Sequence, residues 1–304
     1  MNELRRACAL VAERASQVRI QHQSIGAYAA ALELDRAPIA DPQEETSLPG
    51  SREQLAAFWL TLDAVNFGSG WFPTLRKRPG RSGYHTISAA LRERYEQHGP
   101  WTAAELTVLG PAQVAAVLGQ APEHELMALF ARSLNDLGEH VGDDHGGSFA
   151  AVVDAAGGSA VALAQRLGRW PCFADSSRYG ELELAFLKRA QIAAADLARA
   201  GVARWRDLDG LTMFADNLVP HVLRLDGVLR FEPELVERIE RGELIEHGSS
   251  EEVEIRACAL HAVELIAAAQ PGAATAGIDQ LLWLRGQGPY YKASPRHRSR
   301  CTAY

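Results

Sequence analysis

The sequence predicts an all-α protein, a compact fold of many helices with enough chain for two lobes around a cleft. Alanine is used heavily, in runs such as 29–31 and 193–195, and strand-favouring Thr, Tyr and Ile are sparse. Alanine loses no side-chain entropy in a helix, so this bias favours helices. There is neither an internal repeat nor a low-complexity linker in the 304 residues, which predicts one helical domain over 1–304.

Apolar spacing and capping residues place the helices of the first half. Residues 4, 7, 8, 11 and 15 are apolar at helical spacing, which predicts an amphipathic helix from Asn2 to about Gln23. The polar stretch 37–50 contains prolines and predicts a loop. Ser51 and Gln54 match a capping box, which begins a helix through Phe67. Further helices are expected over 86–97, 102–108, 122–138 and 159–167, with a turn at 143–147.

The second half repeats this pattern. Residues 169–179 are expected to be irregular, and a long helix over 180–200 is stopped by Gly201. Later helices are expected over 216–225, 233–241 and 251–268, followed by the apolar segment 278–284 and a tail rich in Gly, Pro and Arg.

Composition restricts the possible partners and location. The formal net charge is −7, whereas proteins that bind duplex nucleic acid are usually basic. We therefore expect no duplex partner, although a small basic pocket for one phosphate group remains compatible with an acidic chain. The sequence contains neither a run of 18 apolar residues nor an apolar segment behind its N-terminal arginines. These features predict a soluble, cytoplasmic protein without membrane contact, and they leave the oligomeric state open.

No cofactor or metal is expected. The four cysteines are scattered without a CxxC pair, and the histidines show no metal-ligand spacing. The cluster Asp143–His145 could offer metal ligands, but a surface turn is the better interpretation. Glycine-rich motifs for dinucleotides or nucleoside triphosphates are missing as well.

Three polar groups interrupt apolar segments. Asp216 and Asn217 lie in the apolar run 210–225, where they could either cap the following helix or carry out chemistry. Asp279 lies in the apolar segment 278–284, where it could instead stand at a helix terminus. Lys188–Arg189 interrupts a predicted apolar helix and could bind a phosphate or form a solvated face.

Eight short blocks, in order along most of the chain, resemble the queuosine salvage family. They are 66–73 (NFGSGWFP), 147–149 (GSF), 173–175 (FAD), 187–192 (LKRAQI), 212–217 (TMFADN), 254–256 (EIR), 279–283 (DQLLW) and 297–300 (HRSR). The chain departs from the usual family pattern at Asn217, His221 and Ser299, where Tyr, Gln and Thr are common. The resemblance is carried by the order of the blocks rather than by any one of them.

The resemblance implies a hydrolase that cleaves the N-glycosidic bond of queuosine 5′-monophosphate, releasing queuine for tRNA modification and ribose 5-phosphate. An ionised carboxylate near C1′ would stabilise the positive charge that develops on the ribose, and Asp216 is the candidate. A second carboxylate, Asp279, would bind the guanine-like edge of the base. The other expected substrate-binding residues are Phe67, Phe214 and Trp283 for stacking, Ser69 and Asn217, and Lys188, Arg189, His297 and Arg298 for the phosphate.

A shorter resemblance points to the same chemistry. The run from Asp216 to Leu225 is similar to the helix-hairpin-helix pattern of DNA glycosylases, in which an Asp works at the sugar carbon of an N-glycosidic bond. This similarity suggests a DNA-glycosylase-like fold. It also leaves two alternatives open: a nucleic-acid base glycosylase, and a non-catalytic protein that binds a modified nucleoside.

Overall fold

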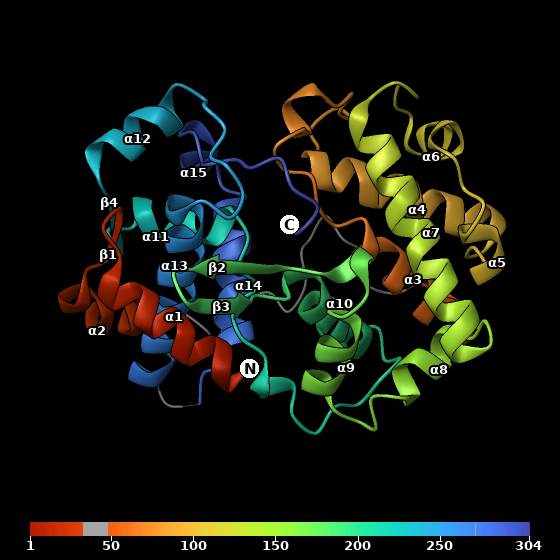
Figure 1. The fold of residues 1–304 in the computed structure, drawn as a ribbon, viewed down its shortest axis with the longest axis horizontal. Coiled ribbons are helices and arrows are strands. Elements are labelled where there is room, and N and C mark those ends of the chain that lie inside the picture. The colour runs from red at the N-terminus through yellow and green to blue at the C-terminus, as the bar shows by residue number, and fades with distance from the viewer. Residues whose placement is uncertain (33–47, 271) are drawn as a thin grey trace.

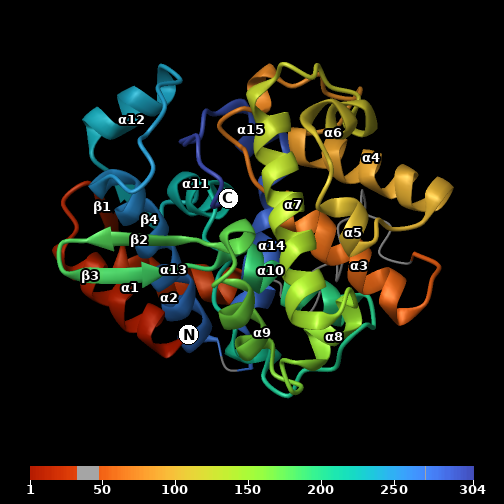
Figure 2. The same ribbon diagram turned by 45° about the vertical axis from the view of Figure 1, so that its right-hand side comes forward.

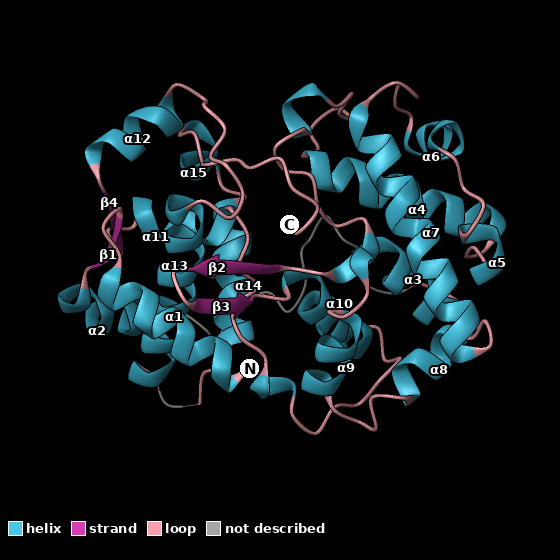
Figure 3. Ribbon diagram, viewed as in Figure 1, coloured by secondary structure: helices cyan, strands magenta, loops and turns pink. Residues whose placement is uncertain are grey.

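The computed structural model describes residues 1–32, 48–270 and 272–304, so most of the predicted loop 37–50 lies outside the described residues. The described chain is mainly helical, which confirms the predicted helical class (Figures 1 and 3). Its buried apolar residues form two large clusters, which we call the first core and the second core, and a small third cluster near Tyr304.

The first core is built by the helices between residues 52 and 199. They are α3 (Arg52–Ala64), α4 (Gly83–His98), α5 (Ala103–Leu106), α6 (Pro111–Leu118), α7 (Glu125–His145), α8 (Phe149–Asp154), α9 (Ala160–Leu167) and α10 (Lys188–Arg199). Helix α7 lies against α3 and α8 in Figures 1 and 2. Large buried side chains such as Trp59, Phe130 and Phe149 fill the space between these helices.

The second core is organised around α13 (Ser250–Ala269). This helix is buried along most of its length and packs against α1 (Asn2–Arg14) and α2 (His22–Ala31). The remaining helices of this half are α11 (Leu218–Leu225), α12 (Pro233–Glu240), α14 (Thr275–Gly286) and α15 (Pro289–Ala293). No described helix is long and apolar enough to span a bilayer.

Two short antiparallel strand pairs correct the predicted helix boundaries. Strand β1 (Val18–Ile20) pairs with β4 (Leu229–Phe231), so the helix predicted over 2–23 ends at Arg14. Strands β2 (Ser176–Tyr179) and β3 (Leu182–Ala185) form a hairpin, so the helix predicted from 180 begins at Lys188. The cause at β1 is tertiary, because the carboxylate of Glu254 accepts the backbone N–H groups of residues 16, 17 and 18.

Local capping signals were better guides than apolar spacing. Ser51 and Gln54 form the predicted capping box at the start of α3. The predicted turn at 143–147 is wrong in part, because α7 continues to His145 before Gly146 ends it with a left-handed φ of 60°. Between α9 and α10 the chain forms a short 3₁₀ helix (Pro171–Phe173) and the β2–β3 hairpin. After α15 the described chain continues without a helix or strand.

Candidate active site

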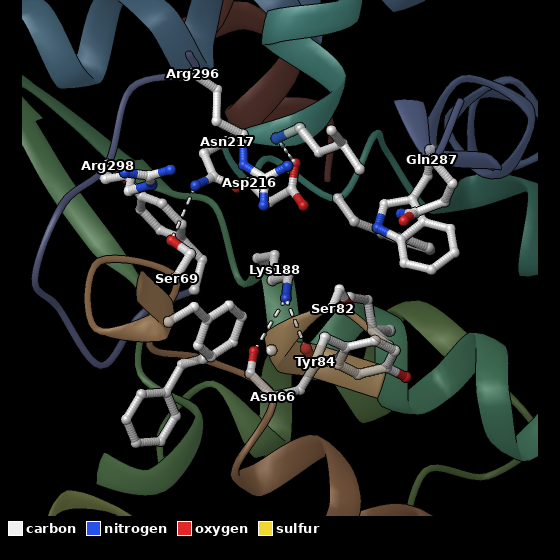
Figure 4. A pocket seen from close by; sticks show the side chains of 18 of the residues that line it. Asn66, Ser69, Ser82, Tyr84, Lys188, Asp216, Asn217, Gln287, Arg296 and Arg298 are labelled. Carbon is white, nitrogen blue, oxygen red and sulfur yellow. Dashed lines mark hydrogen bonds between the residues drawn. The ribbon is translucent and has the colours of Figure 1, made fainter. Parts of the chain in front are cut away.

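A cavity of about 430 Å³ is lined by residues from both cores. Its walls come from the segment 66–73, the start of α4, the exposed side of α10, the segment 214–218, one face of α14, and the tail 296–304. Figure 4 shows Lys188 and Asp216 projecting into its middle, with Asn66 and Ser82 on one side and Asn217 on the other. Segments far apart in sequence therefore meet around one ligand-sized space.

Asp216 is half-buried at the N-terminus of α11. Its Oδ1 atom accepts the backbone N–H groups of Leu218 (2.7 Å) and Val219 (3.2 Å), so Asp216 does cap the helix. Among the described residues, no hydrogen bond reaches Oδ2. Since Asp216 also lines the cavity, capping and a role in binding are compatible. The cap fixes the orientation of the carboxylate, and the helix N-terminus favours its negative charge.

Lys188 is the first residue of α10 and lines the cavity although it is buried. Its Nζ atom donates to the backbone oxygen of Asn66 (3.0 Å) and to Oδ1 of the same residue (3.3 Å). Burial lowers the pKa of Lys188, and the negative charge of Asp216 opposes that shift. The alternative of a solvated face is wrong here, because the side chain is only 6% exposed.

Asp279 also lines the cavity, and it is buried, whereas the third lining carboxylate, Asp196, is paired with Arg199. It lies in the second turn of α14, so it is not helix-terminal. Its Oδ1 atom accepts the backbone N–H of Phe214 at 3.0 Å. Burial raises the pKa of Asp279 well above its usual value, and the charge of Asp216 adds to this rise. Asp216 and Asp279 thus offer two carboxyl groups in different environments.

The predicted aromatic residues Phe67, Phe214 and Trp283 all line the cavity. Phe67 is almost fully buried and packs edge-to-face against Phe130, so it contributes mostly to the core. Trp283 is partly exposed and meets Tyr84, with ring centroids 6.1 Å apart and planes at 88°. Phe214 is linked to Asp279 through its backbone and therefore flanks that carboxyl group.

Ser69 and Asn217 also line the cavity and contact each other. Asn217 Nδ2 donates to Ser69 Oγ at 2.9 Å and to the backbone oxygen of His297 at 3.2 Å. This amide joins the segment 66–73, the start of α11 and the tail. Asn217, one of the three residues at which the chain departs from the usual family pattern, thus connects three walls of the cavity.

The tail 296–304 is ordered against both cores. Arg298 and Arg296 line the cavity (Figure 4), and the backbone oxygen of Arg298 accepts the N–H of Ile245 at 2.9 Å. The backbone oxygen of Tyr304 accepts the N–H of Gly68 at 3.0 Å. A side chain at Gly70 would overlap the carbonyl of Ser299, so glycine is required for this close approach.

Two predicted phosphate ligands do not line the cavity. Arg189 is fully buried and donates to backbone carbonyls of residues 64 (2.7 Å), 172, 302 (2.6 Å) and 303 (3.2 Å). It therefore anchors the tail to α3. The ring of His297 is buried, and its Nε2 atom has no hydrogen-bond partner. Burial lowers the pKa of His297 to about 3, so this ring is neutral and a poor phosphate ligand.

Several lining residues were not singled out as ligands from the sequence. They include Tyr84, Gln280, Gln287, Lys292 and Arg296. The basic run 76–81, which from the sequence could bind the phosphate or form a solvated loop, contributes Lys77 and Arg81 to the lining. Gln287 follows Asp279 by eight residues, so helical spacing from Asp279 could have identified it.

Among the described residues, no group of three or more His, Cys, Asp or Glu side chains is arranged to hold a metal ion. The cluster Asp143–His145 forms the last turn of α7, where His140 pairs with Asp144 at 3.2 Å and stacks on Trp170.

A cavity that brings carboxyl groups, aromatic rings and arginines into one space is typical of a small-molecule binding site. The profile of the queuosine salvage protein family matches residues 47–304. The chain belongs to this family, which confirms the resemblance found in the sequence.

Three of the relatives named queuosine 5′-phosphate N-glycosylase/hydrolase match between 72% and 99% of this chain. The protein of Sphaerobacter thermophilus is 36% identical over 97% of this chain and 95% of its own length. That of Mus musculus is 30% identical over 99% of this chain and 98% of its own length. That of Nematostella vectensis is 36% identical over 72% of this chain and 67% of its own length.

Proposed function

We propose that this protein is a nucleotide N-glycosidase that hydrolyses queuosine 5′-monophosphate to queuine and ribose 5-phosphate. The observation that carries the proposal is the presence of Asp216 and Asp279 in one cavity, in different electrostatic settings, in a member of this family. No metal or other cofactor enters the proposed reaction.

Asp216 is assigned to the ribose. When the C1′–N bond breaks, its electron pair leaves with the base and positive charge develops on the sugar ring. The carboxylate, held by two N–H groups of α11, stabilises that charge and orients the attacking water. The water oxygen then bonds to C1′, and its proton passes to the carboxylate and on to solvent.

Asp279 is assigned to the base. A 7-deazapurine has no N7 to protonate, so negative charge on the leaving base must be stabilised at its pyrimidine half. Burial favours the protonated form of Asp279, which can donate a proton from Oδ2 to an acceptor atom there. After this transfer the carboxylate can accept the base N–H groups, and it takes up a proton from solvent when queuine leaves. Phe214 beside it offers a stacking surface.

The tail arginines are assigned to the 5′-phosphate. Arg296 and Arg298 project from the tail into the cavity on the side where Asn217 and Ser69 lie (Figure 4). Arginine forms bidentate hydrogen bonds with phosphate. Lys188 lies between this side and Asn66, where it can contact ribose hydroxyl groups or the phosphate.

The proposal extends to the arrangement of the two cores and to the cellular compartment of the protein. We propose that the two cores act as two lobes of one domain, with the cavity between them and a DNA-glycosylase-like arrangement around Asp216. The net charge of −7 supports a small-molecule substrate over duplex nucleic acid. The four cysteines are free and buried, which supports a reducing, cytoplasmic environment.

The test is incubation of the purified protein with queuosine 5′-monophosphate, with free queuine followed by chromatography. We expect queuine from the native protein with or without a chelator, and a collapse of the rate for Asp216→Asn. Tight binding of the nucleotide without any release of queuine would overturn the proposal and favour a carrier or sensor.

A further inference from the structure

One face of α14, continued by the C-cap residue Gln287, presents three different functional groups to the cavity. Asp279, Trp283 and Gln287 are spaced four residues apart, and all three line it. Residues four apart lie on the same side of a helix, about 6 Å further along its axis each time. The face therefore offers, in order, a carboxyl group, an indole ring and an amide.

Trp283 forms a corner with Tyr84 at the start of α4. The two rings are nearly perpendicular, and both residues are partly exposed and line the cavity. The buried ring of His85 touches both, at 5.4 Å from Tyr84 and 5.8 Å from Trp283. His85 is itself fixed by Ser82, whose Oγ lies 2.8 Å from its Nδ1. The contacts with His85 therefore fix the relative position of the Tyr84 and Trp283 rings.

This corner lies away from the tail arginines. In Figure 4, Arg298 and Gln287 lie on opposite sides of the cavity, with Asp216 and Lys188 between them. If Asp216 is at the ribose and Arg298 at the phosphate, the base extends toward α14. A substituent on C7, which lies between the sugar and the edge of the base that Asp279 contacts, can then run along α14 to Trp283, Tyr84 and Gln287.

Queuine differs from 7-deazaguanine by an aminomethyl group on C7 whose secondary amine carries a cyclopentenediol. That amine is protonated at neutral pH. Two aromatic faces meeting at a right angle attract an alkylammonium group and pack against its carbon atoms. Building on the proposed function, we propose that Tyr84 and Trp283 form the subsite for this alkylammonium, with Gln287 hydrogen-bonding the diol.

Exposed basic side chains at the cavity mouth oppose this assignment only weakly. Lys77, Arg81 and Lys292 also line the cavity, but all three are exposed, so water and salt screen their charge. The ring faces of the corner act over a short, partly desolvated contact. The aromatic contact rather than the net charge of the mouth therefore determines selectivity at this end.

The test compares three substrates that share the ribose 5-phosphate and the 7-deazaguanine ring. They are queuosine 5′-monophosphate, its 7-aminomethyl analogue without the diol, and 7-deazaguanosine 5′-monophosphate. We expect Trp283→Leu to lower kcat/KM about tenfold for the two ammonium-bearing substrates and far less for the third. Trp283→Phe, which keeps a ring face, should retain most of the selectivity. Gln287→Ala should affect only the substrate with the diol.

Two further variants make the outcomes decisive. Tyr84→Leu repeats the test from the other wall in case Trp283→Leu is poorly folded, and Tyr290→Leu removes an exposed aromatic ring outside the cavity as the matched control. An equal loss on all three substrates in both corner variants would overturn the subsite, since the rings would then act on the shared base. Failure of the native protein to cleave any of the three would instead refute the proposed function.

Discussion

Two regions of this molecule hold buried charged groups, and the regions differ in whether those charges have charged partners. Behind the cavity, Arg256 is held by Asp175 at 2.7 Å and Glu252 at 3.6 Å, and it stacks on the rings of Phe186 and Tyr304 at 4.0 and 4.5 Å. In the cavity, Asp279 has a single hydrogen bond, from a backbone N–H, and no ion pair among the described residues. The charges of the first region are paired with one another, whereas Asp279 has no charged partner within ion-pair distance in the described part of the chain.

The paired charges around Arg256 hold two cavity segments in place. Arg256 Nε donates to the backbone oxygen of Ala215 at 2.9 Å, next to Asp216. Asp175 accepts both Arg256 and the backbone N–H of Lys188 at 2.9 Å. The paired charges therefore contribute to stability and positioning, whereas Asp279 keeps one carboxyl oxygen available to a ligand.

The largest effect is expected from removing the central cation of the paired region. Arg256→Met leaves Asp175 buried without a charged partner and Glu252 paired with His247 alone, which costs about 3–5 kcal/mol of unfolding free energy. Urea denaturation measures this loss. Arg230→Met, at an exposed position on β4, is the matched control and should unfold like the native protein. Equal stability of the two variants would show that Arg256 is not the centre of this region.

Asp216→Asn should strongly reduce the rate of queuine release and leave the folded structure intact. The amide oxygen can still accept the N–H groups of α11, but the charge that stabilises the ribose cation is gone. We expect kcat to fall about 10³-fold, equivalent to about 4 kcal/mol. Stopped assays of queuine release give the rate, and a melting curve checks the fold. A variant that retains most of its activity would remove Asp216 from the reaction.

A smaller effect separates cavity arginines from other tail arginines. Arg298→Gln removes a donor from the proposed phosphate side and should raise KM for queuosine 5′-monophosphate about tenfold. Arg300→Gln, two residues along the same tail and outside the cavity lining, is the control. With queuosine lacking the phosphate, native protein and Arg298→Gln should behave alike. A similar KM change on both substrates would place Arg298 elsewhere.

The smallest effect concerns pH. The pKa of Asp279 is raised in the folded protein, so the folded state binds this proton more tightly than the unfolded chain. Its contribution to stability is full below about pH 4, the usual range of an Asp, and is lost as pH rises toward the folded value. The melting temperature of Asp279→Asn relative to the native protein should therefore increase from pH 4 to pH 8. A pH-independent difference would contradict the raised pKa.

Local signals in the sequence predicted local structure well. The capping box at Ser51 and Gln54 and the helical class follow from propensity and periodicity alone. Helix α1 ends earlier than predicted because Glu254 binds the backbone after it, and α10 starts later because the β2–β3 hairpin precedes it. Both are effects of neighbouring structure that a helical pattern in the sequence cannot reveal. Sequence blocks also identified residues that line the cavity, including Asp216 and Asp279. They could not separate Arg298, which lines it, from Arg189, which binds carbonyls behind it.

The tail makes one wall of the cavity depend on contacts between segments that are far apart in the sequence. Residues 296–304 supply two arginines and Tyr304 to the walls, and they are fastened to Gly68, Arg189 and Ile245. Bringing such distant segments together costs loop-closure entropy, which only the packed fold repays. This wall of the cavity can therefore exist only when both cores hold their partners of the tail in place.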